Sequence, residues 1–168
     1  MTDGVTEGLK HSGSIEVAAT PEQVYDLVSD VTRTGQWSPV CRSCWWDDEA
    51  EAGQVGAWFT GLNELPGRTW QTRSQVVRAE RGREFALVVG GSFVRWAFAL
   101  APVATGTELT ESWEFLPGGI AMLEQKFGDD ASAQIADRTQ QALDGIPRTL
   151  LAIKAIAESA PGRGDVAP

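Results

Sequence analysis

Residues 20–31 read TPEQVYDLVSDV, and this stretch contains the signals that start a short amphipathic helix. Thr20 can accept a hydrogen bond from the backbone N–H of Gln23, and the Gln23 side chain can reach back to the backbone of Thr20. Pro21 suits the first helical position because its fixed φ is already helical. Apolar residues then recur at helical spacing at Val24, Leu27, Val28 and Val31. The pattern predicts a helix with one buried face.

Strand-like runs lie on both sides of this helix. One is expected at residues 12–18, and the others at residues 42–48, 55–63, 69–79, 84–90, 93–101 and 106–116. The turns between the later runs contain glycines, which supply the positive φ that tight hairpins need. These features favour consecutive antiparallel strands.

A long helical segment follows the last strand. Residues 117–119 (PGG) break the strand, and the chain is then predicted to be helical to about Ser159, with a break at residues 128–130 between a short piece and a long one. The long piece has an apolar stripe formed by Ile135, Ala142, Ile146, Leu150, Ile153 and Ala157. Pro147 lies inside it and predicts a kink, which either follows a curved sheet or acts as a hinge for a cavity lid.

The composition indicates one domain and a small apolar partner. The chain has 168 residues, of which 42% are hydrophobic, and we expect a single domain over residues 12–159, a frayed N-terminus over 1–11 and a flexible tail over 160–168. The formal net charge of −9 argues against nucleic acid or an anionic membrane surface as the main partner. No apolar run is long enough to cross a bilayer, and the polar N-terminus has no signal-peptide core, so the expected location is cytoplasmic.

Several motifs along the chain match one known family. They are TPEQVY at residues 20–25, Trp37-Ser38-Pro39, Gly56 with Phe59, Gly61 and Asn63, Trp70, Gly106-Thr107, and Glu111-Ser112-Trp113-Glu114. With the order of elements over residues 12–159, they resemble the START-like (SRPBCC) superfamily, and specifically its polyketide cyclase/dehydrase and lipid-transport group.

The resemblance implies an α+β protein with the helix-grip (Bet v 1-like) fold. In this fold a bent antiparallel sheet of about seven strands wraps around a long C-terminal helix, and two short helices follow the first strand. The resemblance also implies a deep cavity between sheet and helix. Such cavities commonly hold a hydrophobic ligand, and in some members they carry out ring cyclisation or dehydration without a cofactor.

The alternation of side chains along the strands predicts which residues line this cavity. The candidate ligand-binding residues are Trp37, Phe59, Asn63, Trp70, Thr72, Ser74, Trp96, Phe98, Trp113, Met122 and Phe127. The chain has seven tryptophans, and the four among these candidates would give large, stiff apolar surfaces and N–H groups that can orient a ligand oxygen. The alternative is that these aromatic residues simply fill the core.

Glu111 is the candidate catalytic residue. It shares a strand face with Leu109 and Trp113, so its carboxyl group is expected to point inward. Burial without a partner raises the pKa of a carboxyl group, which is a common starting point for acid–base chemistry. The alternative is a carboxylate that pairs with an arginine or a tryptophan N–H, or that reaches solvent at the cavity mouth. Arg73 and Arg95 are expected on the opposite, solvated faces.

Other motifs do not predict a metal or cofactor site. Cys41 and Cys44 form a C-x-x-C pair, but no βαβ unit, typical of a redox motif, surrounds them. A structural zinc site would need two further ligands, and the chain has one histidine, His11. We therefore expect reduced thiols, no metal and no cofactor. No serine or cysteine triad can be built around His11, and no phosphate-binding glycine loop is present.

Three functions are open at this point. The first is a binding module for a hydrophobic small molecule that is lipid-, polyketide- or aromatic-like. The second is a cofactor-free cyclase, aromatase or dehydratase that uses Glu111, with Asn63 or tryptophan N–H groups as orienting donors. The third is a protein-interaction module with a vestigial cavity. The sequence does not predict the oligomeric state, and a homodimer is one alternative.

Overall fold

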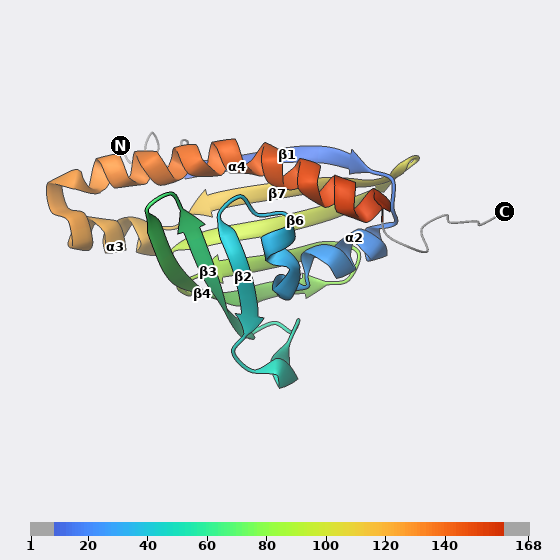
Figure 1. The fold of residues 1–168 in the computed structure, drawn as a ribbon, viewed down its shortest axis with the longest axis horizontal. Coiled ribbons are helices and arrows are strands. Elements are labelled where there is room, and N and C mark those ends of the chain that lie inside the picture. The colour runs from blue at the N-terminus through green and yellow to red at the C-terminus, as the bar shows by residue number, and fades with distance from the viewer. Residues whose placement is uncertain (1–8, 160–168) are drawn as a thin grey trace.

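The computed structural model describes residues 9–159 and has the predicted helix-grip architecture (Figure 1). Seven antiparallel strands form one sheet in the order β1-β7-β6-β5-β4-β3-β2. The strands are β1 (Lys10–Val17), β2 (Cys41–Trp46), β3 (Trp58–Leu65), β4 (Arg68–Glu80), β5 (Glu84–Val89), β6 (Val94–Val103) and β7 (Gly106–Phe115). All seven predicted strands are thus present, with ends that differ by a few residues.

The helices also follow the predicted order. They are α2 (Pro21–Val28), α3 (Pro117–Phe127) and α4 (Ala131–Ser159), together with the 3₁₀ helices η2 (Val31–Gln36), η3 (Glu49–Glu51) and η4 (Gly128–Asp130). The expected tail over 160–168, and residues 1–8 of the expected frayed N-terminus, lie outside the described residues. Lys10 and His11, expected in that frayed segment, instead form the start of β1, opposite Glu114 and Trp113 of β7.

The sheet is strongly bent because β4 changes partners along its length. Its first part, Arg68 to Gln75, pairs with β3, and its last part, from Ser74 onward, pairs with β5. An irregularity in register between Val76 and Arg78 lies next to this change, where an extra residue bends and twists a strand. As a result β2 and β3 run steeply across the direction of β6 and β7 (Figure 1).

The start of α2 has the capping box that its sequence predicts. The Gln23 backbone N–H donates to Thr20 Oγ1 at 3.1 Å, and the Thr20 N–H donates to Gln23 Oε1 at 2.9 Å. The apolar face of the segment, Val24, Leu27, Val28 and Val31, is buried. The cap therefore fixes where the helix begins, and this face packs it onto the end of the sheet.

We expect Thr20→Ala to lower the free energy of unfolding by about 1 kcal/mol, because the Gln23 N–H loses its acceptor. Thr20→Ser keeps the hydroxyl group and should retain most of the stability. Urea unfolding of both variants measures the difference, and equal losses for the two would show that the cap does not stabilise α2.

The long helix α4 packs along β1 and β7 and closes one side of the molecule. Its predicted stripe faces the sheet, with Ala142, Ile146, Leu150, Ile153 and Ala157 buried and Ile135 packed against the core. A Cβ at Gly13 of β1 would lie 3.0 Å from Ile146 Cγ2, so the missing side chain lets the helix approach the sheet closely. Pro147 lies inside the helix on its exposed side.

Candidate functional site

A cavity of about 310 Å³ lies between the inner face of the sheet, η2 and α4. Every strand except β1 contributes to its wall, as do the end of α2 and the segment from Trp37 to Val40. The predicted site residues that line it are Trp37, Phe59, Asn63, Trp70, Thr72, Ser74, Trp96, Phe98, Glu111 and Trp113. The structure thus brings ten of the twelve candidate residues to one cavity.

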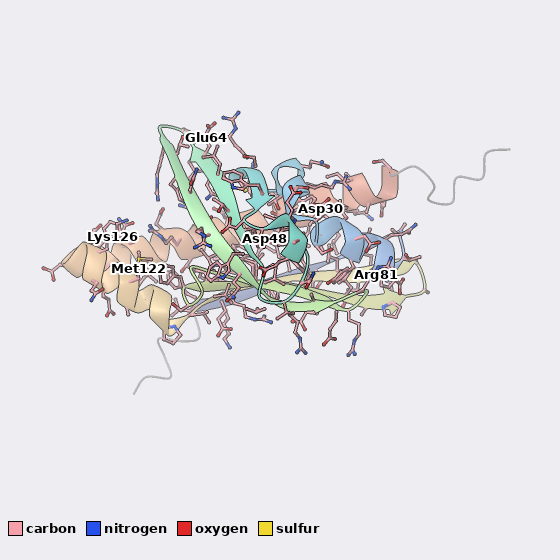
Figure 2. The ribbon with its side chains drawn as sticks, turned by 90° about the horizontal axis from the view of Figure 1, so that it is seen from below. Asp30, Asp48, Glu64, Arg81, Met122 and Lys126 are labelled. Atoms are coloured by element: carbon pink, nitrogen blue, oxygen red, sulfur yellow. The ribbon has the colours of Figure 1, made fainter. Side chains whose placement is uncertain are left out.

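Met122 and Phe127 do not line this cavity, so their expected place in it is corrected. Both lie on α3, which packs against α4 at one end of the molecule, as the label of Met122 shows in Figure 2. Met122 lines a separate shallow hollow with Phe93 and Gly118. Phe127 packs at the edge of the core, with the cations of Lys126 and Arg138 over its ring. The helical pattern of apolar residues predicts which side of α3 is buried, but it does not predict which element that side packs against.

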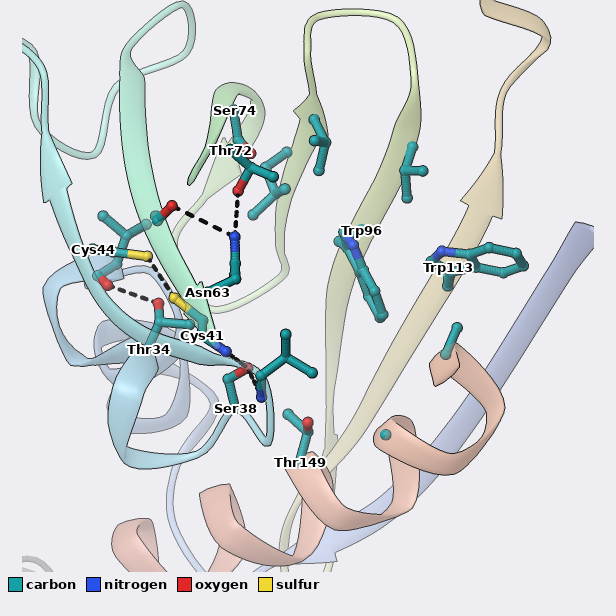
Figure 3. Close-up of a pocket in the computed structure, with 18 of the residues that line it drawn as sticks. Thr34, Ser38, Cys41, Cys44, Asn63, Thr72, Ser74, Trp96, Trp113 and Thr149 are labelled. Atoms are coloured by element: carbon teal, nitrogen blue, oxygen red, sulfur yellow. Dashed lines mark hydrogen bonds between the residues drawn. The ribbon is translucent and has the colours of Figure 1, made fainter. Parts of the chain in front are cut away.

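One wall of the cavity is aromatic. Trp96 projects from β6 towards α4, and Trp113 lies further across on β7 (Figure 3). The Trp113 side chain is only 3% exposed, and it stacks on His11 with 5.7 Å between ring centroids and meets the ring of Phe115 edge-on at 5.7 Å. Trp96 is half-buried. Trp113 is therefore held by other rings, whereas Trp96 offers a free surface to a ligand.

The opposite wall is polar. The Asn63 side chain donates from Nδ2 to Thr72 Oγ1 at 3.1 Å, across the β3–β4 pair (Figure 3). Ser74 is buried beside them on β4, and Thr34 and Thr149 face the same space from η2 and α4. Hydroxyl and amide groups on an otherwise apolar cavity are the groups that orient a bound molecule.

Cys41 and Cys44 also belong to this polar wall, and sequence reasoning did not place them there. A regular strand would put residues three apart on opposite faces, but the register of β2 shifts between Cys41 and Ser43. This irregularity turns both thiols to the cavity, with 3.2 Å between the two Sγ atoms (Figure 3). Their hydrogen bond raises the pKa of Cys41 and lowers that of Cys44, so Cys44 ionises first.

Gly61 of β3 makes room for this pair of thiols. A Cβ there would lie 3.2 Å from the Cys44 Sγ and 3.5 Å from the Cys41 Sγ. A glycine opposite two cysteines is a signal in the sequence that could have indicated the close approach, but only once the pairing of β2 with β3 is known.

Glu111 points into the cavity, as the strand alternation predicts. Its residue is 4% exposed, and in the part of the chain that the structure describes its Oε2 has no hydrogen-bond partner. Burial raises the pKa of this carboxyl group to about 8, so it is mostly protonated at neutral pH. The alternatives of an arginine partner or a solvated carboxylate are not what the structure shows. Arg73 and Arg95 lie outside the cavity, as expected, where Arg73 is exposed and Arg95 half-buried, and they pair with Asp47 and Glu84.

Within residues 9–159 no group of three or more histidine, cysteine, aspartate or glutamate side chains is placed to hold a metal ion. Over the same range no helix is long and apolar enough to cross a membrane.

Comparisons with known proteins agree with this geometry. Residues 9–150 match the family model described as polyketide cyclase / dehydrase and lipid transport, while comparison with curated proteins finds no match. The solved structure of the polyketide-cyclase-like protein Cgl2372 from Corynebacterium glutamicum is 51% identical, with a TM-score of 0.67 over 89% of this chain and 91% of that one.

More distant structures share the fold. The di-domain ARO/CYC StfQ from the steffimycin biosynthetic pathway is 15% identical, with a TM-score of 0.67 over 94% of this chain and 53% of StfQ. The protein CV1439 from Chromobacterium violaceum is 16% identical, with a TM-score of 0.63 over 90% of this chain and 99% of that one. The family model covers most of the length of the present chain, and the chain therefore belongs to the polyketide cyclase/dehydrase and lipid transport family.

Proposed function

We propose that this chain binds a small apolar molecule in the cavity and that the neutral carboxyl group of Glu111 donates a hydrogen bond to a carbonyl or hydroxyl oxygen of that molecule. The observation that supports this most directly is the buried Glu111 Oε2 without a partner, in a cavity with one aromatic wall. A buried polar atom that makes no hydrogen bond is costly, and a ligand oxygen would relieve that cost.

The size and lining of the cavity agree with such a ligand. A volume of about 310 Å³ lies at the small end of the range for small-molecule sites. The face of Trp96 can stack on a flat ring, while Asn63 and Thr72 can accept or donate hydrogen bonds on the opposite side. An open cavity also argues against the interaction-module alternative, for which a filled interior is expected.

A second candidate, a cofactor-free cyclase, aromatase or dehydratase, is favoured by the raised pKa of Glu111. An acid that stays protonated at pH 7 can donate a hydrogen bond to the carbonyl oxygen of a bound ketone and so stabilise its enol form. On this hypothesis a bound poly-β-ketone that closes a ring by aldol addition and then dehydrates leaves as a product that is lighter by one water, which mass spectrometry of the released ligand would detect, whereas ring closure alone gives an isomer that chromatography separates. A binding protein releases the molecule unchanged.

The binding proposal is tested with two matched probes, 2-acetylnaphthalene and 2-isopropylnaphthalene, which have the same shape but only one of which carries an oxygen. We expect both to change tryptophan emission and the ketone to bind about five-fold more tightly, because it accepts the hydrogen bond from Glu111. Glu111→Leu should remove this preference, and raising the pH above 8 should weaken it as the donor ionises.

Glu108→Gln is the matched control, since Glu108 lies on the same strand but faces solvent. It should leave the preference for the ketone unchanged. If neither probe alters the emission of the unaltered protein, the cavity does not bind such molecules and the proposal is wrong. If the ketone binds no better than the hydrocarbon, Glu111 is not the donor.

A further inference from the structure

Two arginines lie beside the wall of the cavity. Arg138 of α4 is part of the cavity wall. Arg68, at the tip of the β3–β4 hairpin, places its guanidinium carbon 4.2 Å from the ring centroid of Trp70, which also lines the cavity. Both guanidinium groups are thus placed at the cavity wall, and burial and, to a lesser extent, the positive charge of Arg68 lower the pKa of Arg138.

Neither cation forms an ion pair in the described part of the chain, although the charge of Asp137, next to Arg138 in the sequence, raises the pKa of Arg138. The ion pairs over residues 9–159 use other arginines, most of them exposed, and two of the lysines, but not Arg68 or Arg138. Two arginines that lie at one cavity and form no ion pair leave guanidinium donors available to an anionic ligand.

The Arg138 side chain is nevertheless held in place. Its Nη1 donates to the backbone oxygen of Gln134 at 3.2 Å and to the Gln134 Oε1 at 2.7 Å. Its guanidinium carbon lies 5.8 Å from the centroid of the Phe127 ring. The Nε and Nη2 donors are not used in these hydrogen bonds, so one side of the fork is oriented and free to bind an anion.

Arg138 and Glu111 lie at different positions along the cavity. Glu111 is opposite Gly13, and Gly13 packs on Ile146 of α4. Arg138 precedes Ile146 by about two helical turns, or about 12 Å along the helix axis. Arg138 and Trp70 are half-exposed, whereas Glu111 is buried, so the two arginines lie nearer to solvent than Glu111 does.

We propose that Arg138 and Arg68 form a carboxylate-binding subsite at the mouth of the cavity, and that the natural ligand is therefore an amphipathic carboxylic acid. Its apolar body lies along Trp96, and its carboxylate is bound by the two guanidinium groups. This inference rests on the proposed function and adds the class of ligand. The planar guanidinium fork matches a carboxylate in geometry as well as in charge.

The test compares 2-naphthylacetate with 2-(2-naphthyl)ethanol, which share the aromatic body and differ in charge. Tryptophan emission measures both affinities. The acid should bind about ten-fold more tightly than the alcohol at low salt, and 0.5 M NaCl should weaken only the acid. Arg138→Met should lower the affinity for the acid by about ten-fold and Arg68→Met by about three-fold, while affinity for the alcohol stays within about two-fold.

Arg148→Met is the matched control, because it removes an exposed cation from the same helix outside the cavity. It should leave both affinities unchanged. If the two probes bind equally, or if Arg148→Met weakens the acid as much as Arg138→Met does, the carboxylate subsite is wrong while cavity binding stands. If neither probe binds, the proposed function fails and this inference fails with it.

Discussion

The Glu111→Gln variant should be more stable than the unaltered protein at pH 8 by about 4 kcal/mol, and about equally stable near pH 4.5. Burial raises the pKa of Glu111 from 4.5 to about 8 in the folded protein. Between these two values the unfolded chain has released a proton that the folded protein still holds. The stability of the unaltered protein therefore falls as the pH rises through this window, and glutamine removes that loss.

Thermal unfolding at a series of pH values measures the effect. At pH 8 the difference in free energy corresponds to an increase in Tm of about 10 °C for a domain of this size. Glu108→Gln, on the solvent side of β7, should keep the pH dependence of the unaltered protein. Parallel pH profiles for the unaltered protein and Glu111→Gln would show that Glu111 is not buried in its neutral form.

Replacement of two cavity tryptophans should separate packing from binding. Trp113→Ala should lower the free energy of unfolding by about 3–5 kcal/mol, because the ring is buried and packs against His11 and Phe115. Trp96→Ala should lower it less, since Trp96 is half-buried, but it should weaken naphthalene probes by about ten-fold through lost stacking.

Urea unfolding and probe titration of both variants test this division of roles. Trp45→Ala is the control, because Trp45 is 41% exposed and does not line the cavity. It should change neither stability nor affinity appreciably. If Trp96→Ala is as destabilising as Trp113→Ala, both rings belong to the core and the aromatic wall is not a ligand surface.

The fold was predictable because its signals are local. The capping box at Thr20 and Gln23 sets the start of α2 within four residues of sequence. Strand alternation turns Glu111 and Trp113 inward, and the regular β6–β7 register keeps that alternation along the whole strand. Where a strand is regular, the alternation of residues along the sequence therefore predicts which side chains face the cavity.

The rest of the site depends on departures from regularity and on tertiary contacts. The irregularity in β2 turns Cys41 and Cys44 to the same side, against the period of a strand. Met122 and Phe127 have the expected apolar character, but the packing of α3 on α4 takes them away from the cavity. Arg138 reads as an ordinary solvated helix residue, and only the packing of α4 on the sheet makes it part of the cavity wall.

The strand order has a consequence for how the chain is made and how fast it folds. Within residues 9–159 the first strand, β1, pairs with the last strand, β7, and with no other, and α4, which covers them, comes later still. During synthesis β1 therefore has no strand to pair with until nearly the whole domain has left the ribosome. Pairings between such distant segments give a high contact order, and domains of that kind fold slowly and expose unpaired strands to aggregation along the way.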